Sequence, residues 1–368
     1  MTTSSTPRLD PLPDRLLAAL IGSCEIAAVA LGDRLGWYRC LATGGPAAAA
    51  ELAQRTGTDA RYAREWLEHQ AVSGYLTVDD VAADPEARRY TLPEEHRGVL
   101  VDELDLTYLT PLASMTAAFL GSVPTLAEVY RGRRTWSWAD MGEVARDGQA
   151  AANRPLFVGP LVDELLPAVP GVDAALTAGG RVADVGCGYG WSSIGMATRW
   201  PEAWVDGFDL DLPSVQRARR HAVDAGVAER VTVRTNDVRA LLDDPHGDFR
   251  LEGAYDLVTA FECVHDLPDP VSVLAAMRRM VRPGGTVLVM DEGVDEEFTA
   301  PGSDVDRLMY GYSLLCCLPD GRAHQPSVGT GTVMRPAVLR EYARSAGFAD
   351  VEVLPLDAGF FRFYRLVS

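Results

Sequence analysis

Three glycines at alternate positions, Gly186, Gly188 and Gly190, follow an apolar run that contains Asp184. Glycine allows a backbone to pass close to a ligand where a Cβ would collide. The spacing differs from the Gly-x-Gly-x-x-Gly of dinucleotide sites, and no lysine follows to grip a phosphate. The pattern therefore favours a nucleotide-like ligand other than NAD, bound at a strand–turn–helix unit. The alternative is an ordinary turn without a ligand.

Carboxylates follow the next apolar runs, at the positions where strands would end. Asp209 lies about twenty residues beyond the glycines, where an acid can accept both hydroxyls of a ribose. Asp237 is placed to accept an adenine amino group, with the backbone amide of Val238 beside it. The predicted ligand-binding residues are Asp184, Gly186, Gly188, Gly190, Asp209, Leu210, Asn236, Asp237, Val238, Phe261 and Glu262.

A histidine and an acid, His265 and Asp266, come just after the fourth predicted strand. His265 is the best candidate for a general base, and Asp266 would orient it. The alternatives are that His265 packs or caps in the structure and that Asp266 caps the next helix.

The segment 291–334 interrupts the regular alternation and is expected to be irregular and to contact a second substrate. Its apolar and aromatic residues could line a pocket. The predicted pocket residues are Met309, Tyr310, Tyr312 and Cys316 of this segment, together with Trp138 and Asn153 from the earlier stretch 101–155. The adjacent pair Cys316-Cys317 is poorly placed for a disulfide or a metal, so we expect it to be buried packing.

These residues need a scaffold that brings strand ends together. Apolar runs alternate with helical patterns from residue 180 onward, which predicts an α/β fold with a doubly wound, Rossmann-like parallel sheet. The last two strands lack a helix between them and should pair antiparallel. The seven predicted strands are 182–185, 203–208, 231–235, 255–261, 286–290, 351–354 and 360–366.

The N-terminal part has another organisation. Helical spacing over 17–28, 34–41, 47–55 and 59–73 is followed by two short strands, 75–78 and 89–92, around an acidic turn. This order predicts a winged helix. Residues 1–100 hold fourteen acids against ten arginines, which disfavours DNA binding. We expect a winged-helix domain over 1–100, a helical connector that covers the active site over 101–155 and a catalytic domain over 156–368.

Composition excludes several classes. The chain of 368 residues has 52 acids against 34 basic residues, all arginine, and a formal charge of −18. This balance argues against nucleic-acid and anionic-membrane partners. The six cysteines show no metal-binding spacing, so no metal is expected. No signal peptide and no charge-free stretch of transmembrane length is evident, so we expect a cytoplasmic protein.

The motif DVGCGYG resembles the first motif of class I S-adenosylmethionine (SAM) methyltransferases, and GFDLD, TNDV, FECVHDLPDP and RPGG extend the resemblance over 180–290. LGDRLGWYRCLA, NRPLF and YGYSLLCCLPDG are similar to bacterial methyltransferases with an N-terminal winged helix used for dimerisation. The resemblance implies SAM as methyl donor, a homodimer, Glu262 near the sulfonium, and His265-Asp266 at the position of a catalytic base.

These features together indicate a SAM-dependent methyltransferase acting at oxygen or nitrogen of a small-molecule acceptor. Two alternatives remain open at this point. One is a SAM-binding regulator that uses its winged helix on DNA. The other is a methyltransferase scaffold that has lost methyl transfer.

Overall fold

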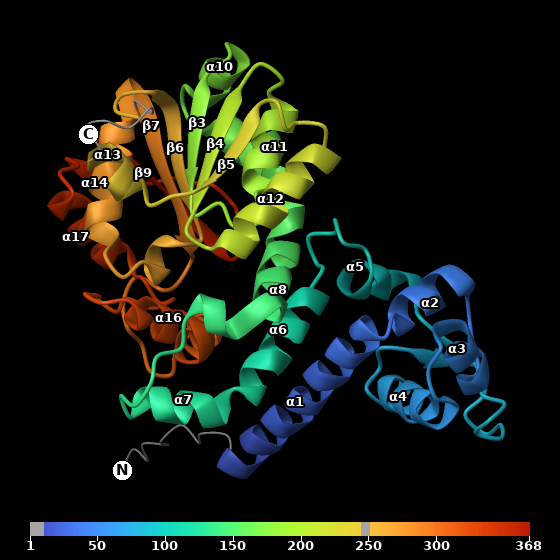
Figure 1. Cartoon of the computed structure of the whole chain (residues 1–368). Helices are drawn as coiled ribbons and strands as arrows, with labels where there is room; N and C mark the ends of the chain where they lie inside the picture. The colour runs from blue at the N-terminus through green and yellow to red at the C-terminus, as the bar shows by residue number, and fades with distance from the viewer. Residues whose placement is uncertain (1–10, 244–250) are drawn as a thin grey trace, which may run out of the picture. The chain divides into compact units, whose positions relative to one another are not determined.

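The computed structural model describes residues 11–243 and 251–368. The chain divides into two compact units, Met1–Leu120 and Gly121–Ser368. The predicted connector 101–155 is therefore shared between the two units. Figure 1 labels the helices and strands of each.

The first unit is helical and carries a small two-stranded sheet. Its elements are α1 (Leu12–Arg34), α2 (Trp37–Gly44), α3 (Ala49–Thr56), α4 (Ala60–Val72), β1 (Thr77–Val78), β2 (Tyr90–Thr91), η1 (Glu94–His96), α5 (Arg97–Leu100) and α6 (Thr110–Gly121). Asp59 caps α4 by accepting from the amides of Arg61 and Tyr62, as the sequence predicts. β1 and β2 pair antiparallel, so the expected wing is present but shorter than predicted.

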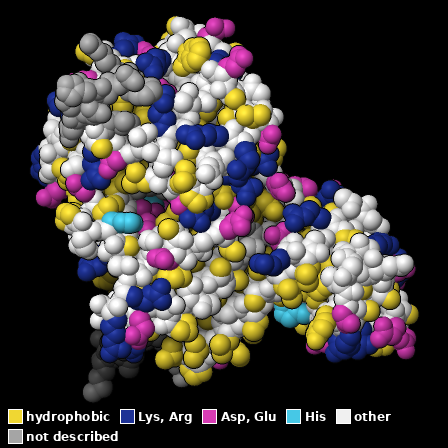
Figure 2. All heavy atoms as spheres, viewed as in Figure 1, with side chains coloured by type: hydrophobic (Ala, Val, Ile, Leu, Met, Phe, Trp, Pro, Cys, Tyr) yellow, Lys and Arg dark blue, Asp and Glu magenta, His cyan; other side chains and the backbone are white. Residues whose placement is uncertain are grey.

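Helix α1 exposes apolar side chains along its length. Leu12, Leu16, Leu17, Leu20 and Ile21 are 52–72% exposed, and apolar side chains gather over α1 in Figure 2. Among the described residues α1 is the one helix long and apolar enough to cross a membrane, and α6 with the following helix α7 (Val123–Tyr130) passes the same test if counted as one broken span. The core helix of a soluble protein and a signal sequence near the N-terminus have the same length and apolar composition.

The second unit is built on a seven-stranded sheet in the order β5-β4-β3-β6-β7-β9-β8. The strands are β3 (Arg181–Val185), β4 (Trp204–Asp209), β5 (Val231–Thr235), β6 (Tyr255–Phe261), β7 (Val281–Glu292), β8 (Asp350–Val353) and β9 (Phe361–Val367). β3 to β7 run parallel, whereas β9 pairs antiparallel with both β7 and β8. The predicted sheet and its antiparallel end are confirmed.

Helices cover both faces of this sheet. Figure 1 shows α11 and α12 beside one face and α13, α14 and α17 beside the other, and two separate apolar cores match these two layers. The helices are α7 (Val123–Tyr130), α8 (Trp138–Val158), η2 (Leu161–Leu165), α9 (Leu166–Ala168), α10 (Val172–Thr177), α11 (Trp191–Arg199), α12 (Leu212–Asp224), α13 (Val238–Asp243), η3 (Val264–Asp266), α14 (Pro270–Met280), α15 (Asp304–Tyr312), η4 (Ser313–Cys317), α16 (Leu318–Ala323) and α17 (Pro336–Ser345).

The structure differs from the expectations at the start of β7 and within the segment 291–334. The strand predicted over 286–290 begins earlier, because β7 starts at Val281, which pairs with Tyr255. The segment 291–334 is irregular over 293–303 and 324–334, as expected, but helical in its middle, where α15, η4 and α16 follow one another over 304–323. Helix α8 continues through Pro155, so the predicted boundary between the connector and the last domain falls within a helix.

Candidate functional site

The glycine turn joins β3 to α11 and has left-handed backbone at all three glycines, with φ of 73°, 51° and 79° at Gly186, Gly188 and Gly190. A Cβ at Gly186 would lie 2.6 Å from the Cys263 sulfur, so only glycine fits there. A Cβ at Gly188 would meet nothing within 4 Å. The turn is therefore tightly packed at one end and open at its centre.

Asp184 supports this turn from below. Its side chain is 1% exposed, and its carboxylate accepts hydrogen bonds from the hydroxyls of Ser192 (2.6 Å), Ser193 (2.7 Å) and Thr259 (2.9 Å). Burial raises the pKa of this carboxyl above its ordinary value. Asp184 thus shapes the turn and does not offer a free oxygen to a ligand.

Asp209 ends β4 and faces the glycine turn. Its two carboxylate oxygens accept from the backbone amides of Gly188 and Asp211, each at 2.8 Å. Burial raises the pKa of Asp209. Leu210 follows with 65% of its side chain exposed. Both residues lie at the carboxyl edge of the sheet, where ligands bind in such folds.

Asp237 follows β5 and forms an ion pair with Arg239 that the sequence did not predict. The Arg239 guanidinium donates to both of its oxygens, at 2.9 and 3.0 Å from Nε, and these bonds hold the pKa of Asp237 below its ordinary value. Asn236 is exposed, whereas the Val238 side chain is buried. An adenine amino group would share the Asp237 carboxylate with Arg239.

Glu262 follows β6 in left-handed backbone, with φ of 54°, the one non-glycine residue so placed among those described. Its carboxylate accepts from Gln149 at 2.9 Å and from Asn153, both on α8. Burial raises the pKa of Glu262 to about 7. The neighbouring Phe261 is 5% exposed and packs against the rings of Phe157 and Phe363, so its side chain belongs to the core.

His265 lies at the centre of a buried acidic cluster and is 2% exposed. Its Nδ1 is 2.8 Å from Asp291 Oδ1 and 3.1 Å from Glu292 Oε2, and its Nε2 is 3.3 Å from Asp266 Oδ1. Asp266 was predicted to orient the ring, but the closest carboxylate is Asp291, from the end of β7. Asp266 does not cap the next helix either, since Asp269 caps α14.

The histidine and the carboxyl groups of this cluster shift one another's pKa values. Burial alone would lower the pKa of His265, but Asp266, Asp291 and Glu292 raise it well above the ordinary histidine value. Burial raises the pKa of Glu292 well above its ordinary value, whereas the histidine holds that of Asp291 low.

Two triplets in the described part of the chain have the geometry of metal ligands: His265 with Asp266 and Cys317, and His265 with Asp291 and Glu292. All their ligand atoms lie within 4.8 Å of one another.

The predicted pocket residues are distributed over three places in the second unit. The Trp138 amide donates to Asp320 of α16 at 2.6 Å, and Cys316 Sγ lies 3.3 Å from Met141 Sδ, so both face the junction of α8 with η4 and α16. Asn153 bonds Glu262 instead. On α15, Met309 is buried, Tyr310 is 40% exposed and Tyr312 lies where α15 passes into η4.

Sequence reasoning missed several residues of the site. Asp291 and Glu292 directly follow a predicted strand, and the rule that singled out Asp209 and Asp237 would have found them. Arg146, Gln149 and Asp320 gave no such signal, because helical spacing does not say which loop a helix faces.

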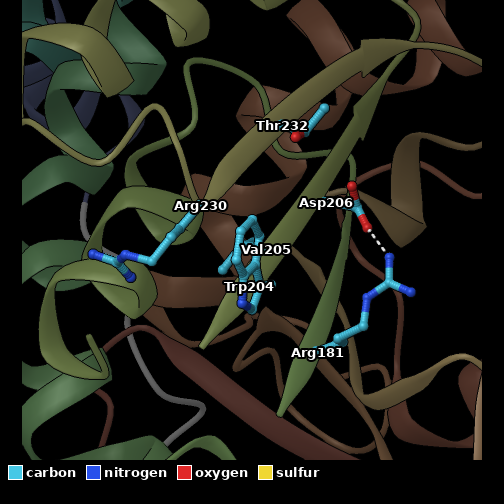
Figure 3. Close-up of a pocket in the computed structure, with 6 residues that line it drawn as sticks. All are labelled: Arg181, Trp204, Val205, Asp206, Arg230 and Thr232. Carbon is cyan, nitrogen blue, oxygen red and sulfur yellow. Dashed lines mark hydrogen bonds and ion pairs between the residues drawn. The ribbon is translucent and has the colours of Figure 1, made fainter. Parts of the chain in front are cut away.

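A surface hollow of about 370 Å³ lies elsewhere in the second unit. It is lined by Arg181, Trp204, Val205, Asp206, Arg230 and Thr232. Figure 3 shows the Arg181–Asp206 ion pair beside it. β3 and β4 begin at Arg181 and Trp204, so the hollow is at the end of the sheet opposite to the glycine turn.

Two families match the chain. Residues 182–285 match the methyltransferase domain, and residues 24–101 match the Rv2258c-like winged HTH domain. The chain therefore carries a methyltransferase domain that includes the glycine turn and His265, preceded by a winged HTH domain.

Curated relatives and solved structures agree with this assignment. The chain is 39% identical over 170 residues to a ubiquinone biosynthesis O-methyltransferase of Marinobacter nauticus, and 33% identical over 168 residues to that of Alkalilimnicola ehrlichii. These matches cover 46% of this chain, and 64% and 60% of the two relatives, so the chain spans less than two thirds of their length.

Solved structures resemble the fold over nearly the whole chain. PigF with SAH matches with a TM-score of 0.72 and 20% identity over 98% of this chain and 100% of that one. Human N-acetylserotonin methyltransferase in complex with SAM matches with a TM-score of 0.65 and 18% identity, covering 99% of both chains. At these identities the likeness establishes the fold.

Proposed function

We propose that this chain, whose methyltransferase domain follows a winged HTH domain, transfers a methyl group from SAM to oxygen or nitrogen of a small-molecule acceptor. The main observation behind this proposal is that the glycine turn, Asp209, Asp237 and Glu262 all lie at the carboxyl ends of four adjacent parallel strands. The curated relatives named above are O-methyltransferases.

The residues present fit SAM. The open space at Gly188 leaves room for a ligand against bare backbone. Asp209 would hold the ribose, Asp237 and the Val238 amide the adenine, and Glu262 the amino-acid end. SAM, when bound, supplies a methyl group on a positively charged sulfur. The chain's own task is to align the acceptor and exclude water.

His265 is the proposed base, acting through Nε2. Asp291 and Glu292 occupy its Nδ1 side, which fixes the ring and stabilises the imidazolium that forms when Nε2 takes a proton. Asp266, at 31% side-chain exposure, is the more open neighbour. An acceptor hydroxyl or amine would therefore reach Nε2 on the Asp266 side.

The acceptor pocket is proposed at the junction of α8, η4 and α16, with Trp138 and Cys316 beside Asp320. Burial raises the pKa of Asp320 to about 7. Met309, Tyr310 and Tyr312 would extend the pocket along α15. The acceptor would then lie near Asp266, whose charge acts on Asp320.

Incubation with methyl-labelled SAM and a panel of phenols, carboxylic acids and amines tests the proposal. Release of S-adenosylhomocysteine (SAH) that depends on an acceptor supports it. SAM binding without turnover on any acceptor would favour a scaffold that has lost methyl transfer.

A second candidate is a SAM-binding regulator, which the winged HTH match favours. The wing, however, carries Asp79, Asp80, Asp84 and Glu86, and acidic side chains repel phosphates. A gel-shift assay with genomic fragments distinguishes the two, since a regulator gives a retarded band and our proposal gives none. The proposed partner is a second copy of the chain, and the proposed compartment is the cytoplasm.

A further inference from the structure

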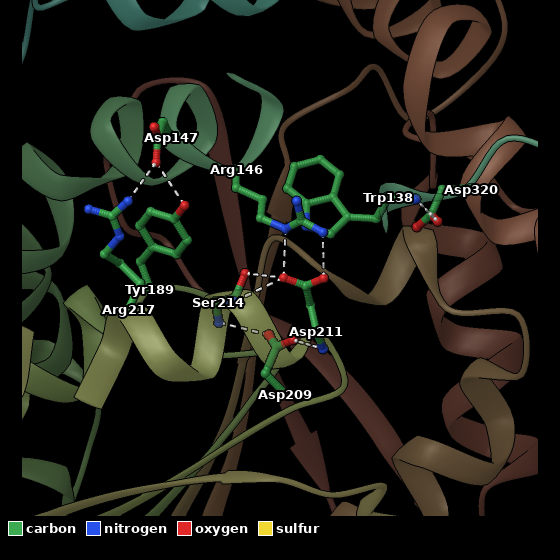
Figure 4. Close-up of polar contacts among 10 residues, drawn as sticks. Trp138, Arg146, Asp147, Tyr189, Asp209, Asp211, Ser214, Arg217 and Asp320 are labelled. Atoms are coloured by element: carbon green, nitrogen blue, oxygen red, sulfur yellow. Dashed lines mark hydrogen bonds and ion pairs between the residues drawn. The ribbon is translucent and has the colours of Figure 1, made fainter. Parts of the chain in front are cut away.

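A buried ion pair connects α8 to the loop after β4. Arg146 donates from Nε and Nη2 to the two carboxylate oxygens of Asp211, both at 2.7 Å, as Figure 4 shows. The two side chains are 9% and 13% exposed. Two parallel bonds of this kind fix direction as well as distance, which an arginine can do and a lysine cannot.

Asp211 connects this ion pair to the candidate cofactor site through Asp209. Its backbone amide donates to Asp209 Oδ1, and the Gly188 amide donates to Asp209 Oδ2. Its carboxylate also caps α12 by accepting from the amide and hydroxyl of Ser214. Arg146, Asp211, Asp209 and the glycine turn thus form one continuous chain of hydrogen bonds.

Helix α8 also forms hydrogen bonds with the glycine turn and with Glu262. Asp147 accepts from the Tyr189 hydroxyl in the glycine turn at 2.7 Å, and Gln149 with Asn153 holds Glu262. Helix α8 therefore touches the loops after β3, β4 and β6. Of these contacts, the Arg146 pair is the one that acts on the carboxylate proposed to recognise the ribose.

We infer that Arg146 is a positioning residue of the cofactor site: by fixing Asp211 it sets the Asp209 carboxylate at the angle that accepts the ribose hydroxyls. The inference rests on the proposed function, since it presupposes an adenosyl ligand. It distinguishes Arg146 from a purely structural arginine, because its loss should affect recognition of the hydroxyls more than binding of the rest of the ligand.

The test compares the affinities of SAH and 2′-deoxy-SAH by calorimetry. A hydrogen bond to a charged group corresponds to about 10- to 100-fold in affinity, so the unaltered protein should prefer SAH by about tenfold or more. With Arg146→Gln we expect SAH to weaken by about tenfold or more, and the preference to fall below about threefold.

Further variants keep the inference testable if Arg146→Gln does not fold. Arg146→Lys keeps the charge but removes the two-pronged contact. Asp211→Asn retains a good helix cap and removes the pair. Both should also reduce the preference for SAH. The matched control is Arg335→Gln, which breaks a similarly buried pair with Asp306 (2.7 Å, 13% and 3% exposed) and should leave the preference unchanged.

The outcomes separate the two proposals. If the unaltered protein binds neither compound, the proposed function fails. If it prefers SAH and the Arg146 and Asp211 variants keep the same ratio, or if Arg335→Gln lowers that ratio equally, the positioning role of Arg146 is wrong.

Discussion

His265 combines near-complete burial with three carboxylate neighbours. A base in this setting accepts a proton readily and releases it slowly, because each carboxylate stabilises the imidazolium. The residue is therefore suited to an acceptor whose proton must be removed as the methyl group arrives.

We expect His265→Ala to lower kcat by about tenfold or more, within the range for loss of a general base. SAH affinity should be unchanged, because the histidine does not lie among the proposed nucleoside contacts. Steady-state kinetics and calorimetry on the same preparation check both parts. Unchanged kcat would reject His265 as the base.

The rate should also depend on pH in a defined direction. As the proposed base, His265 would act in its neutral form. Because its pKa is raised, kcat/KM should rise with pH through a midpoint above the ordinary value of about 6.5. Asp291→Asn removes one stabilising carboxylate, lowers the pKa and should move this midpoint to lower pH. A pH–rate profile measures it.

The exposed Asp304, 93% accessible, provides a control through Asp304→Asn. This change should leave the midpoint where it was. A profile that Asp291→Asn does not move would show that Asp291 has no influence on the titrating group.

At the scale of elements, the glycine turn offers a matched pair of substitutions. Gly188 and Gly226 both have positive φ, 51° and 71°, and a Cβ at either meets nothing within 4 Å. Gly188→Ala and Gly226→Ala should each destabilise the protein by about 1 kcal/mol, because alanine resists left-handed backbone. Only Gly188→Ala should also weaken SAH binding, by about tenfold or more, since the added methyl group enters the proposed cofactor space.

Thermal unfolding and calorimetry separate the two effects. Equal losses of SAH affinity in both variants would mean that backbone strain, and not occupancy of the turn, controls binding.

The elements themselves were largely predictable. The strands β5 and β6 have the predicted limits, because apolar runs bounded by Gly, Pro and charged residues define buried parallel strands. Contacts that depend on packing were not predictable. Arg146 lies in a stretch that suggests only a helix, and its partner Asp211 is 65 residues away.

The same limit applies within the site. Asp209 and Asp237 were predicted as site residues because each follows a predicted strand, but the hydrogen bonds from Arg239 to Asp237 were not predicted. Phe261 ends a predicted strand and was therefore expected to contact the ligand. Its ring lies in the core instead, because successive side chains of a strand point to opposite faces of the sheet.

At the scale of the whole molecule, the exposed apolar face of α1 favours a second copy of the chain. Burying side chains such as Leu17, Leu20 and Ile21 stabilises an interface by about 1.5–3 kcal/mol for each large residue. We expect a homodimer, and Leu20→Glu should shift it toward monomer in sedimentation velocity.

Val81→Glu, at a residue 73% exposed in the wing, is the control and should leave the dimer intact. A monomeric parent protein, or a dimer that Leu20→Glu does not weaken, would contradict the role of α1. Binding of the parent protein to neutral lipid vesicles through α1 would point to a membrane instead.

The most direct test of the whole account is calorimetric titration of the folded protein with SAH. We predict one saturable site per chain. Asp209→Ala, which removes the Asp209 carboxylate, should abolish binding, whereas Arg335→Gln should retain it. Absence of binding to well-folded protein, or equal binding by Asp209→Ala, would contradict the claim that this edge of the sheet recognises an adenosyl sulfur compound.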